Sequence, residues 1–156
     1  MKSSLKQSVL ALTLSALIAT PAVADEATEK AIKARQGLMQ VYSFNLGILS
    51  AMAKGEMDYD AVLATNAAEN LQAAVTMKND AMWPEGSGED SGYKTRALAE
   101  IWSTYPKVAE AGKAMADASI ALTAVAGNGL DALKGSIGDA GKGCKGCHDD
   151  FRAKKK

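Results

Sequence analysis

The sequence predicts an all-α protein, an antiparallel up-down-up-down four-helix bundle. Four segments of the 156-residue chain repeat apolar side chains at alternating steps of three and four, the spacing of amphipathic helices in a bundle. Only 3 prolines occur, and no segment alternates apolar and polar residues over the length of a strand. The last two helical segments are joined by a short glycine-rich connection, which makes them antiparallel neighbours.

Residues 1–24 have the pattern of a cleaved secretory signal peptide. Two lysines precede an apolar run over residues 9–19, and residues 22–24 form an Ala-Val-Ala cleavage site. The run is too short for a stable membrane span, although an uncleaved anchor is the alternative interpretation. Cleavage would export residues 25–156 as a single domain.

The charge balance argues against nucleic acid as a partner. The full chain carries 18 basic and 18 acidic side chains, and removal of Lys2 and Lys6 would leave 16 and 18, a formal charge of −2. Nucleic-acid-binding proteins carry strongly basic surfaces instead.

Residues 28–54 are predicted to form the first helix, which Gly55 ends. Arg35 interrupts its main apolar stripe, and a guanidinium among apolar side chains requires an anionic partner. A second apolar face of the same helix, with Leu38, Val41 and Ile48, suggests burial on two sides. The main stripe consists of Ile32, Arg35, Met39, Tyr42, Leu46, Leu49 and Ala53.

Residues 59–81 are predicted to form the second helix, with Asp58 as its N-cap and Trp83-Pro84 as its stop. Residues 85–92 form the longest polar, glycine-rich stretch in the chain, and we expect the one long connection there.

Residues 97–102 are predicted to make a short helical turn before the third helix. Ser103 or Thr104 caps that helix, and Pro106 is tolerated in its first turn. A Gly-Asn-Gly turn at residues 127–129 separates it from a fourth helix over residues 130–153.

The fourth helix contains the motif Cys-Lys-Gly-Cys-His at residues 144–148, the C-x-x-C-H attachment signature of c-type haem. Cys144, Cys147 and His148 share one helix face, so two thiols can join one porphyrin while the imidazole reaches the iron. They are the only cysteines and the only histidine of the chain. A structural zinc site needs four ligands, a thioredoxin-like motif needs a βαβ unit, and a helical disulfide at this spacing has poor geometry.

The motif therefore predicts one covalently attached haem c on the C-terminal helix. Both cysteines lie in register with the apolar stripe of that helix, so we expect the porphyrin inside the bundle. Gly138, Gly141, Gly143 and Gly146 are costly in a helix, and their missing side chains would leave room for a flat ring.

The sequence resembles the cytochrome c′ family. The resemblance covers residues 25–156, and its specific parts are residues 35–40, 100–103 and 144–152. The position of C-x-x-C-H near the C-terminus separates the chain from ordinary electron-transfer cytochromes c, which place the motif near the N-terminus and take a methionine ligand from downstream.

The resemblance implies a role for each residue of the motif region. Cys144 and Cys147 would carry the thioether bonds, and His148 would be the proximal iron ligand. Arg152 matches the arginine beside that histidine.

On the first helix, the resemblance implies that Arg35 and Gln36 meet the haem propionates and that Met39 covers the distal face of the iron. Thr95 lies in a stretch that corresponds to a loop at the haem edge. Members of the family are usually homodimers packed through their first two helices, which would account for the second apolar face of the first helix.

The sequence leaves two candidate functions, which differ in whether Met39 occupies the sixth coordination position of the iron. In one, Met39 is an apolar lid over five-coordinate iron, and the protein is a periplasmic cytochrome that binds NO or CO, transfers electrons to a small redox partner, or both. In the other, Met39 is the sixth ligand of a His/Met electron carrier. We expect no enzyme, because only Gln36 and Gln40 lie near the distal level and neither is an acid–base residue. We also expect no membrane partner.

Overall fold

The computed structural model describes residues 21–155, with side chains described from residue 25 onward. Four long helices form the bundle: α1 (Pro21–Lys54), α2 (Ala61–Thr76), α4 (Tyr105–Thr123) and α5 (Leu130–Phe151). Most of the predicted signal peptide lies outside the described residues. Among the helices within them, none is both long and apolar enough to cross a membrane.

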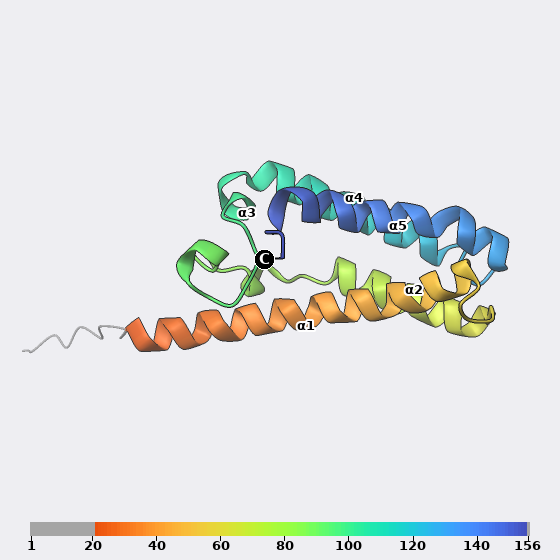
Figure 1. The fold of residues 1–156 in the computed structure, drawn as a ribbon, viewed down its shortest axis with the longest axis horizontal. Coiled ribbons are helices and arrows are strands. Elements are labelled where there is room, and N and C mark those ends of the chain that lie inside the picture. Colours follow the sequence, from red (N-terminus) through yellow and green to blue (C-terminus); the bar gives the residue numbers. More distant parts are fainter. Residues whose placement is uncertain (1–20, 156) are drawn as a thin grey trace, which may run out of the picture.

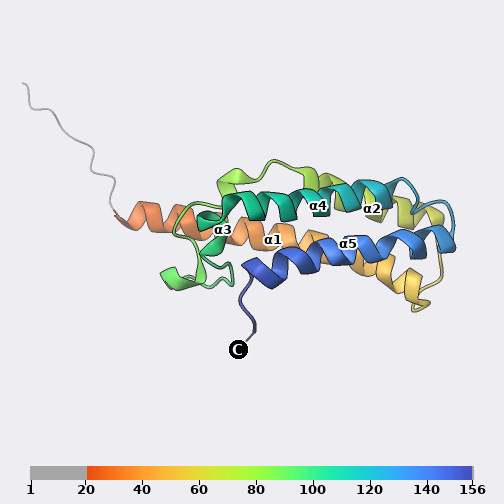
Figure 2. The ribbon, with the colours of Figure 1, turned by 90° about the horizontal axis from the view of Figure 1, so that it is seen from above.

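The four long helices close into a ring of neighbours, which confirms the predicted antiparallel bundle. Helix α1 packs against α2 and α5, and α4 packs against the same two helices. Figures 1 and 2 show α1 as the longest helix, whose N-terminal turns extend beyond the other three. The long connection between α2 and α4 contains three short elements: η1 (Asp80–Met82), η2 (Glu89–Ser91) and α3 (Glu100–Ser103).

Helix α1 is longer than predicted, and its C-terminal end is as predicted. Its described part begins at Pro21, seven residues before the predicted start. It ends at Lys54, and Gly55 follows with a φ of +76°, a conformation that glycine adopts readily.

Helix α2 differs from its prediction at both ends. Its N-cap is Asp60, whose carboxylate accepts a hydrogen bond from the Leu63 amide (2.8 Å), and not Asp58. The helix ends at Thr76 rather than at residue 81, because Met77 is extended. The Tyr42 hydroxyl of α1 donates to the Ala74 carbonyl (3.1 Å), so a tertiary contact satisfies one of the last carbonyls of the helix.

Pro106 lies in the first turn of α4, as predicted, and Thr104 occupies the N-cap position. The Thr104 side chain does not cap the helix, because its hydroxyl donates to the Glu100 carbonyl (2.7 Å). Helix α5 ends at Phe151, two residues before its predicted end, because Arg152 is extended and forms an antiparallel bridge with Ala97. The Leu98 amide donates to the Phe151 carbonyl (3.1 Å), and the Ala153 amide donates to the Arg96 carbonyl (2.9 Å). The C-terminal segment is therefore tied to the long connection.

The apolar core is divided into two clusters. The larger cluster joins all four long helices and includes the fully buried Leu49, Leu71, Leu122 and Leu133. The smaller cluster joins the long connection to the end of α5 through Ala97, Ile101 and Phe151, with both tryptophans against it.

Replacement of Leu71 by alanine should lower the free energy of unfolding by about 2–5 kcal/mol, because it leaves a cavity in the larger cluster. Leu63→Ala is the matched control on the same helix, since Leu63 is 39% exposed and Leu71 is fully buried. Urea unfolding followed by circular dichroism measures both. Equal losses would contradict the assignment of Leu71 to the core.

Candidate haem site

Cys144 and Cys147 lie one turn apart on α5, and neither forms a disulfide. Both are partly buried, and they contact different parts of the core: Cys144 packs against the larger cluster and Cys147 against the smaller one. The structure thus places the two thiols where the core is divided.

Burial favours the uncharged forms of all three motif side chains. Burial raises the pKa of the Cys144 and Cys147 thiols. The pKa of His148 is lowered, first by burial and then by the positive charges of Arg152 and Arg96. A neutral imidazole has the free lone pair that a metal ligand needs.

The tie between the C-terminal segment and the long connection brings two arginines near His148. Arg152, predicted to lie beside the histidine, lowers its pKa, and so does Arg96, which follows Thr95 in the stretch expected at the haem edge. The Arg96 guanidinium donates to the Ala153 carbonyl (3.3 Å). Helix spacing could indicate Arg152 but not Arg96, since the latter depends on the pairing of two distant segments.

The structure brings Arg35, Gln36 and Thr95 together at the side of α1 that faces the long connection. The Arg35 guanidinium donates to the Thr95 hydroxyl (3.2 Å), and the Gln36 amide donates to the Lys94 carbonyl (2.8 Å). Arg35 is also held by Ser87, a fully buried residue that sequence reasoning missed. Ser87 gives no signal in the sequence, because it resembles any serine of a glycine-rich loop.

Arg35 is a buried cation without a carboxylate partner in the described part of the chain. Its side chain is only 2% exposed, burial lowers its pKa, and none of the ion pairs among residues 25–155 includes it. Its hydrogen-bond acceptors are two hydroxyl and two carbonyl oxygens. The anion that the sequence demands for Arg35 is thus not supplied by these residues, and a haem propionate would supply it.

Met39 lies one turn beyond Arg35 on α1 and is partly buried. It belongs to neither core cluster, whereas Met52 of the same helix is fully buried in the larger one. Its side chain therefore has no established packing role in the core.

These features fit a haem c group. Two free cysteines at attachment spacing, a neutral histidine and a buried guanidinium without an anion correspond to thioethers, axial ligand and propionate partner. Among the described residues, no three His, Cys, Asp or Glu side chains are grouped to hold a metal ion.

The glycines of α5 are not equivalent. A Cβ on Gly143 would lie 3.0 Å from Met115 Cα and 3.1 Å from its Sδ, whereas a Cβ on Gly138, Gly141 or Gly146 would meet nothing within 4 Å. At Gly143, Met115 of α4 fills the space that we expected for the ring. The role of Gly143 is therefore to allow close packing of α4 on α5. Met115 Sδ is also 3.7 Å from Cys144 Sγ.

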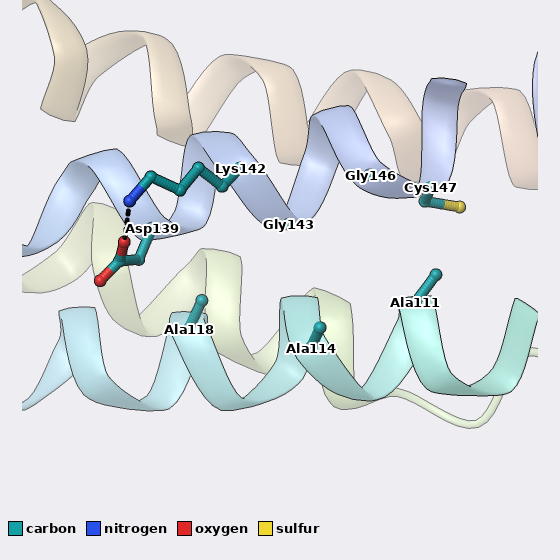
Figure 3. Close-up of a pocket in the computed structure, with 8 residues that line it drawn as sticks. All are labelled: Ala111, Ala114, Ala118, Asp139, Lys142, Gly143, Gly146 and Cys147. Atoms are coloured by element: carbon teal, nitrogen blue, oxygen red, sulfur yellow. Dashed lines mark hydrogen bonds and ion pairs between the residues drawn. The ribbon is translucent and has the colours of Figure 1, made fainter. Parts of the chain in front are cut away.

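A cavity of about 270 Å³ lies between α4 and α5 beside Cys147 (Figure 3). Its volume falls below the range of about 300–1,000 Å³ typical of small-molecule sites. Figure 3 shows the Cys147 sulfur pointing along α5, away from Ala114 and Ala118. The cavity includes only one of the predicted haem residues, so it is not the haem site by itself. It is lined by Ala111, Ala114, Ala118, Asp139, Lys142, Gly143, Gly146 and Cys147.

An antiparallel four-helix bundle with C-x-x-C-H on its last helix defines a class of c-type haem proteins. The family model described as Cytochrome C′ matches residues 30–152, and the chain belongs to the cytochrome c′ family. Proteins of this family carry covalently attached haem c, and this chain carries one such group, because it has one attachment motif.

Known relatives cover nearly the whole chain. It is 38% identical to cytochrome c-554 of Cereibacter sphaeroides over 93% of this chain and 95% of that protein. A solved cytochrome c′ from Rhodobacter Spheriodes has a TM-score of 0.80 and 36% identity, over 82% of this chain and 98% of that one. A nitric oxide complex of a cytochrome c′ variant from Alcaligenes xylosoxidans has a TM-score of 0.72 and 30% identity, over 82% and 97%.

Substitution of Gly143 by alanine should lower the free energy of unfolding by about 1–3 kcal/mol, because the methyl group overpacks the α4–α5 contact. Gly141→Ala is the matched control and should raise it by about 0.5–1 kcal/mol through helix propensity. Chemical unfolding monitored at 222 nm measures both. Stabilisation by both substitutions would refute the packing role of Gly143.

Proposed function

We propose that the protein is a periplasmic monohaem cytochrome c′ with five-coordinate iron, which binds small diatomic gases such as NO and CO. In this proposal Cys144 and Cys147 hold the haem through thioether bonds, and His148 is the only protein ligand of the iron. The observation that supports it best is the placement of both cysteines at the division between the two core clusters. The related protein with bound nitric oxide supports gas binding.

The bound haem supplies an iron that can take a gas ligand or an electron. The residues of the chain position it and control its surroundings. The two apolar clusters pack against the two attachment cysteines, and Met39 covers the distal face as an apolar lid. Arg35, with Gln36 and Thr95 beside it, meets the propionates, and Arg152 lies near His148 on the proximal side.

We propose transfer of electrons to a small periplasmic partner as a second use of the same site, and no enzymatic turnover. The chain has no second histidine to serve as an acid–base group, since His148 is the only one, and the Gln36 amide donates to the Lys94 carbonyl. The periplasmic location rests on the predicted signal peptide and on the attachment of c-type haem outside the bacterial cytoplasm.

A specific observation supports the second candidate, a His/Met electron carrier. Met39 is partly buried without being part of either core cluster, so its thioether is available to a metal. Such ligation would raise the reduction potential and close the gas-binding position.

The ferric protein near neutral pH should give a high-spin or mixed-spin spectrum by optical and electron paramagnetic resonance spectroscopy, because His148 alone binds the iron. Met39→Leu keeps the size and removes the sulfur, so it should leave the spin state unchanged. A low-spin parent with a sulfur-to-iron charge-transfer band, converted to high spin by Met39→Leu, would establish the second candidate.

We further propose a homodimer through α1 and α2. Phe44 is 70% exposed on α1, Val62 is 70% exposed on α2, and Val41 is also exposed. Large apolar side chains exposed in this way on two adjacent helices suit a protein interface.

Phe44→Glu should convert the dimer into a monomer, because it would bury a charge in the apolar interface. Tyr105→Glu on α4 is the matched control, since Tyr105 is 68% exposed but lies outside the proposed interface. Sedimentation velocity of the holoprotein measures both. A parent that sediments as a monomer, or equal effects of the two variants, would rule out this interface.

A further inference from the structure

Ser87 holds Arg35 by two short hydrogen bonds. One terminal nitrogen of Arg35 donates to the Ser87 hydroxyl and the other to the Ser87 carbonyl, each at 2.6 Å. The Ser87 hydroxyl in turn donates to the Pro84 carbonyl (2.7 Å), which fixes its direction. Ser87 is fully buried, so neither bond competes with solvent.

The two terminal nitrogens of Arg35, here called the Arg35 fork, have two further acceptors, which are more distant. The Met82 carbonyl lies at 3.3 Å and the Thr95 hydroxyl at 3.2 Å. A terminal guanidinium group has four N–H donors, and these four contacts occupy them. A carboxylate that approached Arg35 could replace the two longer bonds while the two short bonds to Ser87 stayed in place.

The aromatic side chains of the long connection fix the plane of the guanidinium. The face of the Trp83 ring packs against the guanidinium, and the ring centre lies 4.7 Å from Arg35 Cζ. Trp83 is held in turn, because the Trp102 indole donates to the Trp83 carbonyl (3.0 Å). Stacking on Trp83 and the two hydrogen bonds to Ser87 together hold the Arg35 fork in one orientation.

We propose that Ser87 is a positioning residue, which fixes the Arg35 fork so that its positive charge stays at the propionate edge of the haem. The inference rests on the proposed role of Arg35 at the haem. A fixed cation there favours the ferrous state, which has one positive charge less than the ferric state, and so raises the reduction potential.

The test is a double-mutant cycle on the holoprotein, with the reduction potential measured by spectroelectrochemical titration. Arg35→Ala should lower the potential, and Ser87→Ala should lower it by a smaller amount, because the backbone bond from Arg35 remains. The double variant should match Arg35→Ala alone, since Ser87 acts only through the arginine. Ser91→Ala, an exposed serine of the same connection, is the control and should change nothing.

Each other outcome decides against a part of the proposal. If Arg35→Ala leaves the potential unchanged, the role of Arg35 in the proposed function is wrong. If Arg35→Ala shifts it but Ser87→Ala does not, or the two shifts add, only the positioning role is wrong. If Ser87→Ala yields no holoprotein while Ser87→Thr does, the hydroxyl is a folding requirement, which also overturns the positioning role.

Discussion

The division of the apolar core at Cys144 and Cys147 is the constraint on which the rest of this bundle depends. The larger cluster is completed by side chains of the four long helices, whereas the smaller one relies on the long connection and on the end of α5. One continuous helix spans both clusters, and its attachment motif lies between them. A rigid, apolar group joined at these two positions would unite the two parts into one core.

Arg35 on the neighbouring helix α1 imposes a second constraint. A buried guanidinium needs all its donors satisfied, and the long connection supplies them with hydroxyl and carbonyl oxygens. This explains why a segment so rich in glycine follows one path over the end of the bundle. The same contacts leave the positive charge of Arg35 uncompensated, which suits an anionic cofactor edge.

The sequence was informative wherever a local pattern decided the structure. Helical spacing predicted the four long helices, and the unusual position of Arg35 in an apolar stripe indicated a special role. The end of α2 was not predictable from local spacing, since one of its last carbonyls is bonded by Tyr42 of another helix. Ser87 and Gly143 could not be distinguished from other serines and glycines, because their roles depend on Arg35 and Met115 from other helices.

The packing of α1 against α5 has a consequence for how the chain is made. The helix with Arg35 and Met39 leaves the ribosome first, and the helix with the cysteines leaves last. Neither half of the site has its partner until α5 has been synthesised. A chain interrupted before α5 would have no attachment point and could not receive the prosthetic group.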